Sequence, residues 1–139
     1  MTQYQDLPVY RHRNEILTAL SNNQVIVVES PTGSGKTTQI PLILKDAGYA
    51  ELGVIGITQP RRIAAMSVSE YIKKQINDEG TYCGYTMRFH DTTDKNTRIK
   101  IMTDGILLQE VKDDPILSRY SVIMVDEAQD CNADNWEII

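Results

Sequence analysis

The 139-residue chain is constrained most by an apolar segment that leads directly into a glycine-rich turn. Residues 24–29 (Gln-Val-Ile-Val-Val-Glu) predict a buried strand, and residues 30–37 follow as Ser-Pro-Thr-Gly-Ser-Gly-Lys-Thr. Glycines allow successive backbone amides to point into one concavity at the positive end of the next helix. The segment therefore predicts a phosphate-binding loop, in which Lys36 reaches the outer phosphates of a nucleoside triphosphate and Thr37 ligates Mg²⁺. Ser30 stands where the full pattern has its first glycine.

Bulk properties narrow the class of protein. The length fits one domain, and no apolar run approaches the roughly 20 residues that a membrane helix needs. Cys83 and Cys131 match no metal-binding or redox spacing, which predicts reduced thiols in a soluble, cytoplasmic protein. The net charge of −5 means that any contact with nucleic acid must come from a local basic patch.

Apolar runs alternate with helical patterns along the chain, which predicts an α/β fold with a mostly parallel sheet and flanking helices. In such sheets ligands bind at the carboxyl ends of the strands. The expected strands are 24–29, 53–58, 82–89, 98–103 and 121–125, with a polar turn over 91–97. The expected helices begin at Pro8, Gly35, Arg61 and Asp104, the last capped by Thr103 or Asp104.

Two adjacent carboxylates end the apolar strand at residues 122–125. Asp126 is suited to hold the hydration shell of Mg²⁺, and Glu127 to orient and deprotonate a water molecule that attacks the γ-phosphate. Downstream of a phosphate-binding loop, this pair indicates ATP hydrolysis rather than simple phosphate binding.

Several strings together resemble the DEAH/RHA group of superfamily 2 RNA helicases in order and spacing. Thr-Gln-Pro-Arg-Arg and Thr-Asp-Gly are far more specific than a phosphate-binding loop alone. The similar strings lie at 32–41, 58–65, 84–89, 103–105 and 126–129.

The resemblance implies a P-loop NTPase of the RecA-like type that uses ATP and Mg²⁺ and holds single-stranded RNA, with DNA as the alternative. Implied nucleotide contacts are Thr32, Gly33, Ser34, Gly35, Lys36, Thr37, Thr38 and Tyr71. The hydrolytic set is Lys36, Asp126, Glu127 and Gln129, and the Mg²⁺ set is Thr37 and Asp126. The RNA-facing set is Arg61, Arg62, Thr103, Asp104 and Gly105.

Some of these residues have a plainer interpretation. Arg61 and Arg62 also fit the solvated start of a helix. Tyr71 stands where similar helicases often have an arginine against the base, and it fits either stacking or the inner face of its helix. Tyr85 and Phe89 are stacking candidates or packing residues.

The chain departs from the group at residue 129, where glutamine replaces the histidine of Asp-Glu-Ala-His. Glutamine can donate and accept hydrogen bonds but carries no positive charge. The replacement therefore bears on how ATP hydrolysis is coupled to nucleic-acid binding.

The resemblance also implies that the chain covers one part of a helicase core that has two RecA-like domains. We expect residues 1–139 to be the N-terminal part of the first domain, weakly active without the second. A further strand is expected between strands 24–29 and 121–125. The alternatives are a nucleotide-binding or interaction module without helicase activity, and a DNA-directed motor.

Overall fold

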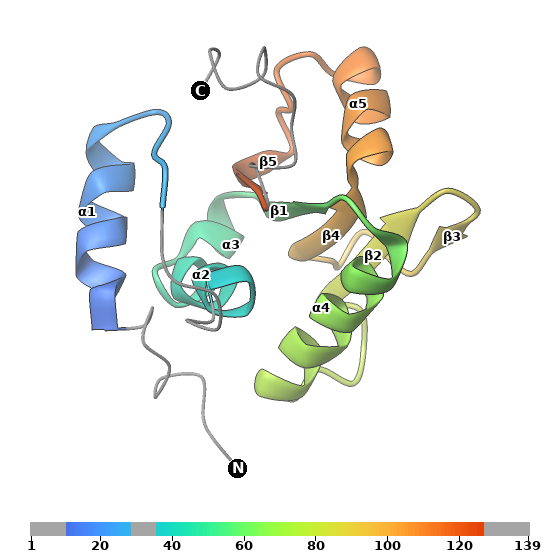
Figure 1. The fold of residues 1–139 in the computed structure, drawn as a ribbon, viewed down its shortest axis with the longest axis horizontal. Coiled ribbons are helices and arrows are strands. Elements are labelled where there is room, and N and C mark those ends of the chain that lie inside the picture. Colours follow the sequence, from blue (N-terminus) through green and yellow to red (C-terminus); the bar gives the residue numbers. More distant parts are fainter. Residues whose placement is uncertain (1–10, 29–35, 127–139) are drawn as a thin grey trace.

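The computed structural model describes residues 11–28 and 36–126, without the side chain of Lys36. These residues form a five-stranded sheet in the order β3-β2-β4-β1-β5, in which only the β2–β3 pair is antiparallel (Figure 1). The predicted α/β class with a mostly parallel sheet is confirmed. The strands are β1 (Val54–Gln59), β2 (Cys83–Met87), β3 (His90–Asp91), β4 (Ile99–Thr103) and β5 (Tyr120–Val125). The helices are α1 (Arg13–Asn22), α2 (Lys36–Asp46), α3 (Tyr49–Leu52), α4 (Arg62–Gln75) and α5 (Asp104–Asp113).

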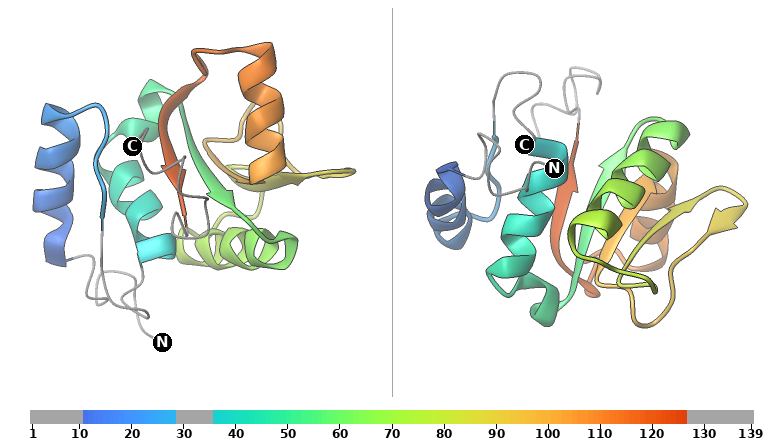
Figure 2. Two further views of the ribbon diagram at one scale, coloured as in Figure 1. Left: turned by 45° about the horizontal axis from the view of Figure 1, so that its top comes forward. Right: turned by 90° about the horizontal axis from the view of Figure 1, so that it is seen from below.

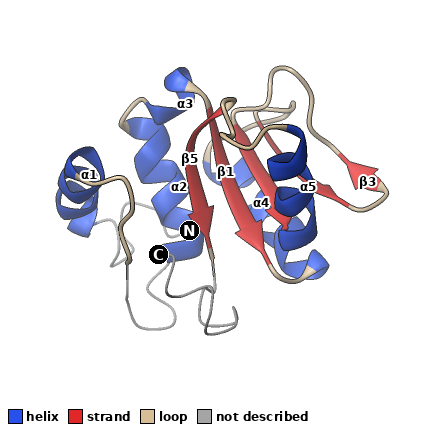
Figure 3. Cartoon of the chain, turned by 90° about the horizontal axis from the view of Figure 1, so that it is seen from above, coloured by secondary structure: helices blue, strands red, loops and turns tan. Residues whose placement is uncertain are grey.

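Helices cover both faces of the sheet. Helices α2 and α4 lie side by side on one face and α5 lies on the other, while α1 packs outside α2 (Figures 2 and 3). The central strands are apolar because both of their faces are covered. Ile55, Ile57, Ile99 and Ile101 are each 0% exposed, and full burial of such a side chain stabilises the fold by about 2 kcal/mol. None of the helices within 11–28 and 36–126 has the length and apolar character needed to cross a bilayer.

The strand predicted over 24–29 is wrong for residues 24–28. This segment has the side-chain alternation of a strand, since Val25 and Val27 are 53% and 61% exposed while Ile26 and Val28 pack against the core. However, it forms no ladder with the described strands. A strand is defined by its hydrogen-bonded neighbour, and β5, the last strand on this side of the sheet, pairs with β1 alone among the described strands.

The chain reverses earlier than predicted after β2. Residues Thr86 and Met87 pair antiparallel with β3, so Asp91 belongs to a strand and the predicted polar turn over 91–97 begins one residue too early. The reversal occurs at Arg88 and Phe89, and Phe89 has a positive φ of 68°. A positive φ at a non-glycine residue is uncommon, and sequence periodicity gives no sign of it.

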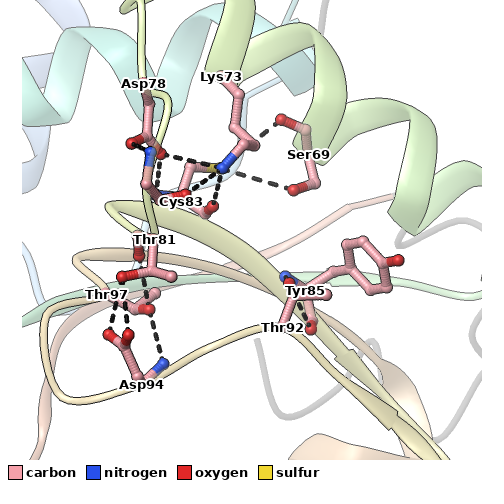
Figure 4. Close-up of polar contacts among 10 residues, drawn as sticks. Ser69, Lys73, Asp78, Thr81, Cys83, Tyr85, Thr92, Asp94 and Thr97 are labelled. Atoms are coloured by element: carbon pink, nitrogen blue, oxygen red, sulfur yellow. Dashed lines mark hydrogen bonds and ion pairs between the residues drawn. The ribbon is translucent and has the colours of Figure 1, made fainter.

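Polar contacts hold the segments before and after this hairpin (Figure 4). The carboxylate of Asp78 accepts hydrogen bonds from the backbone amides of Gly80 (2.9 Å) and Cys83 (2.8 Å). Lys73 lies 3.4 Å from the same carboxylate. Thr97 donates to the carbonyl oxygen of Thr81 at 2.7 Å and thereby joins the two loops. These bonds position the start of β2 next to β4.

Helix boundaries agree with the expectation to within a few residues for α2, α4 and α5. The four-residue α3 was not predicted. For α1, the described helix begins at Arg13, and the expected start at Pro8 lies outside the described residues. Thr103 occupies the N-cap position of α5 as expected, but its side chain makes no capping hydrogen bond.

Candidate nucleotide and nucleic-acid site

The carboxyl ends of three parallel strands meet at one edge of the sheet. Gln59, the last residue of β1, is paired in register with Thr103 at the end of β4. On its other side, Thr58 of β1 is paired with Val125, which precedes Asp126. Parallel strands bring their carboxyl ends to the same edge, and ligands of α/β proteins bind there. Thr103 therefore lies on one side of the end of β1, and Asp126 follows the strand on its other side.

The first turn of α2 reaches the end of β5 through one side chain. The hydroxyl of Thr37 donates to the Asp126 carboxylate and lies 3.0 Å from each of its oxygens. Asp126 is only 7% exposed, so its carboxylate depends on protein donors or a cation in place of water. The structure thus brings together the two residues that the sequence assigns to Mg²⁺.

The chemistry of this pair fits Mg²⁺. Magnesium prefers oxygen ligands in octahedral geometry at about 2.1 Å, which places neighbouring ligand atoms about 3 Å apart. The hydroxyl of Thr37 and the Asp126 carboxylate have that oxygen chemistry and a separation of 3.0 Å. When bound, Mg²⁺ would neutralise charge on the phosphates.

Several expected site residues lie outside the described part of the chain. These are Thr32, Gly33, Ser34, Gly35, Glu127 and Gln129, together with the side chain of Lys36. Helix α2 does begin at Lys36, close to the expected start. Thr38 is half-buried and accepts a hydrogen bond from the Gln39 amide at 3.0 Å.

The expected nucleic-acid residues cluster at the ends of β1 and β4. Arg61 and Arg62 are exposed at the start of α4. The guanidinium of Arg62 lies against the β2–β3 hairpin, where it donates to the sulfur of Met87 (3.3 Å) and to the carbonyl oxygen of Arg88 (3.5 Å). Arg62 therefore both presents charge and supports the hairpin.

The second part of this cluster is the start of α5. Asp104 is exposed, and Thr103 is half-buried with its hydroxyl unused for capping. At Gly105, an added Cβ would meet nothing within 4 Å, so the backbone of this turn is open to close approach. A phosphate backbone could approach helix amides at such a surface.

The three aromatic candidates differ in their environment. Tyr85 is 8% exposed and packs edge-on against His90 at 5.0 Å between ring centroids, so it is a packing residue. Phe89 is 91% exposed at the hairpin, with the Arg88 guanidinium 4.9 Å from its ring centre. Tyr71 is half-buried on α4, about 14 Å along the helix from Arg62.

Gln59 is a site residue that sequence reasoning missed. Its side-chain amide donates to Oδ2 of Asp126, and the residue is 2% exposed. The available signal was a polar residue at the end of an apolar strand, immediately before Pro60. Its partner is 67 residues away in the chain, which no local pattern specifies.

Comparison with known proteins agrees with this geometry. The family model described as DEAD/DEAH box helicase matches residues 10–137. The chain belongs to the DEAD/DEAH box helicase family. Among curated members, it is 54% identical over 125 residues to the ATP-dependent RNA helicase HrpA of Borreliella burgdorferi. It is 49% identical over 135 residues to the ATP-dependent RNA helicase DHX33 of Drosophila melanogaster.

This chain of the DEAD/DEAH box helicase family is short beside these relatives. The alignments cover 89% and 95% of the chain, but only 15% of HrpA and 20% of DHX33. The chain thus spans a fifth or less of the length of these two relatives.

Proposed function

We propose that the chain is the N-terminal part of the first RecA-like domain of an ATP-dependent RNA helicase that hydrolyses ATP. The observation that supports this most directly is the Thr37–Asp126 contact, which joins the start of α2 to the end of β5. The relatives named as ATP-dependent RNA helicases support the reaction and the substrate class. We place this activity in the cytoplasm.

In the proposed site, each group has a definite task. Residues 32–38 bind the triphosphate, with Lys36 on the outer phosphates, and Tyr71 packs near the base. Thr37 and Asp126 hold Mg²⁺, while Glu127 orients the attacking water. Gln129 links the nucleotide to neighbouring parts of the core by hydrogen bonding.

The RNA side uses the cluster at the ends of β1 and β4. Arg61 and Arg62 contact phosphates, and Thr103, Asp104 and Gly105 present the start of α5 to the strand backbone. Arg61 and Arg62 concentrate positive charge at this place, so the cluster can bind RNA although the net charge of the chain is −5.

Two further parts complete the proposal. Among the described strands β5 pairs with β1 alone, and we propose that one more strand joins the sheet on the other side of β5. A second RecA-like domain would then close the ATP site. The isolated chain should therefore hydrolyse ATP weakly at most.

The test is a pair of separate titrations. Mg²⁺·ADP binding should fall at least tenfold in Lys36→Ala, and short single-stranded RNA binding should fall in the double variant Arg61→Ala, Arg62→Ala. ADP binding that survives Lys36→Ala would remove the phosphate site. RNA binding unchanged in the double variant would remove the nucleic-acid face, and DNA of the same sequence tests the DNA-directed alternative.

Gln129 favours a second candidate, a nucleotide-binding module without helicase activity. The two candidates are separated by ATP hydrolysis of the whole protein with and without RNA. Stimulation by RNA supports the helicase, and binding of Mg²⁺·ATP with no stimulated turnover supports the module.

A further inference from the structure

We infer that Gln59 is a positioning residue that couples the RNA side of the site to Asp126. The inference rests on the proposed function and adds to it the route by which bound RNA changes hydrolysis. It begins from the place of Gln59 in the sheet. This residue ends β1, the strand that lies between β4, with Thr103 at its end, and β5, which leads to Asp126.

The side chain of Gln59 is directed at the nucleotide side. It follows Ile55 and Ile57 at alternate positions of β1, and these two isoleucines share a core cluster with residues of α2 and α4. At the end of that row, the Gln59 amide donates to Oδ2 of Asp126, the carboxylate that Thr37 also contacts. A buried amide beside a carboxylate forms a charge-assisted hydrogen bond, which is among the stronger polar contacts in proteins.

The backbone of Gln59 leads directly to the RNA side. Pro60 follows and has a fixed φ, and Arg61 is extended with φ −121° and ψ 139° before α4 begins at Arg62. Only Pro60 and Arg61 separate β1 from α4, and the proline ring removes one of the backbone rotations of this connection. In the proposed coupling, a shift of Arg61 and Arg62 towards a bound phosphate would move the backbone of Gln59 and, through its amide, the carboxylate of Asp126.

Coupling of this kind is reciprocal, because each ligand must change the affinity for the other by the same factor. RNA at Arg61 and Arg62 would reorient the carboxylate that holds Mg²⁺, and nucleotide would reorient the arginines. A purely structural Gln59 would fill its buried site and satisfy one hydrogen bond without linking the two ligands.

The experiment compares Gln59→Met with the unaltered whole protein. Methionine keeps the length and volume of the side chain and removes the donor. ATP hydrolysis is measured with saturating Mg²⁺, without RNA and with a saturating single-stranded RNA. We expect the RNA-free rate to fall about tenfold, as for one lost hydrogen bond to a charged group, and the RNA-stimulated rate to fall about a hundredfold or more. Gln75→Met, the same change at the far end of α4, should leave both rates unchanged.

The ratio of the RNA-stimulated rate to the RNA-free rate tests the coupling role of Gln59. If Gln59→Met lowers both rates by the same factor, or lowers neither, the coupling role is overturned. If the unaltered protein itself shows no Mg²⁺-dependent hydrolysis or no RNA stimulation, the proposed function fails instead, so the two failures are distinct.

Two additional measurements keep the test decisive if Gln59→Met folds poorly. Gln59→Asn retains the amide on a side chain one methylene shorter, and it should lose an intermediate share of RNA stimulation. In a double-mutant cycle with Arg61→Ala, Arg62→Ala, the extra loss caused by Gln59→Met should disappear, because the RNA signal is already absent. Additive losses in that cycle would contradict the coupling.

Discussion

The hydroxyl of Thr37 lies 3.0 Å from both carboxylate oxygens of Asp126, although 89 residues separate them in the chain. Thr37 lies in the first turn of α2 and Asp126 follows β5, so the contact exists only when α2 and β5 take their places in the same fold. With the Gln59 amide it gives this carboxylate two protein donors in a nearly water-free position.

Removing the Thr37 hydroxyl should weaken magnesium-dependent binding. Thr37→Val keeps the shape of the side chain but loses a proposed Mg²⁺ ligand and the hydrogen bond to Asp126. We expect the Kd of Mg²⁺·ADP to rise about tenfold or more, and ADP without Mg²⁺ to be affected much less. Calorimetric titration measures both. Thr86→Val, which removes a hydroxyl bonded to Asp91 on the β2–β3 hairpin, should leave both values unchanged.

Asp78 should make the free energy of unfolding depend on pH in the acidic range. Burial opposes its ionisation, but hydrogen bonds from Cys83 and Gly80 and the charge of Lys73 outweigh burial and hold the pKa of Asp78 below its ordinary value. A lowered folded-state pKa contributes stability above the unfolded pKa of about 4, and this is lost as pH falls through the folded value. Asp78→Asn should therefore cost about 2 kcal/mol at pH 7 and progressively less below pH about 4.

Urea unfolding at several pH values checks this prediction. A cost that stays constant from pH 7 down to pH 3 would mean that the carboxylate charge contributes nothing. Asp113→Asn, on an exposed residue at the end of α5, serves as the control.

The ion pairs of Glu110 should show how burial determines the contribution of an ion pair to the free energy of unfolding. The Glu110 carboxylate lies 3.1 Å from Lys100, whose side chain is 16% exposed, and 3.0 Å from Arg119, whose side chain is 71% exposed. Glu110→Ala breaks both ion pairs and the hydrogen bonds from the Tyr120 hydroxyl and leaves the less exposed Lys100 without this partner, so it should cost about 3 kcal/mol. Arg119→Ala should cost less than about 1 kcal/mol because its charge is solvated. Equal costs in urea unfolding would contradict this account.

Two glycines should respond oppositely to alanine. At Gly53 an added Cβ would lie 2.9 Å from the backbone of Arg119 and of Ser121, so Gly53→Ala should destabilise the β1–β5 junction by about 2 kcal/mol. At Gly105 the Cβ is unobstructed, and alanine in α5 should stabilise by about 0.5–1 kcal/mol. If RNA approaches this turn closely, Gly105→Ala should nevertheless weaken RNA binding, which fluorescence anisotropy would detect.

Many of the helices and strands of this protein could be predicted from local sequence patterns. The apolar runs of β1, β4 and β5 and the helical periodicity of α4 and α5 depend on near neighbours in the chain, so their type and approximate bounds were predictable. Helix α2 begins at the end of the glycine-rich turn because that turn and the following residues encode it locally.

Other features depend on partners distant in the chain, and only the tertiary structure decided them. Residues 24–28 have the composition of a strand but lack a described strand beside them, and composition alone does not supply hydrogen bonds. Phe89 is exposed where the chain reverses with a positive φ, and this reversal depends on the pairing of β2 with β3. The role of Gln59 follows from the register that places it between Thr103 and Asp126.

The sequence by itself therefore determined the order of a glycine-rich segment before Lys36, an arginine pair and a strand that leads to Asp126, an order that matches the DEAD/DEAH box helicase family. The tertiary structure decided how these parts meet, because parallel strands gather their carboxyl ends whatever their separation in sequence. It placed Gln59 at the centre of that edge and the hydroxyl of Thr37 on Asp126.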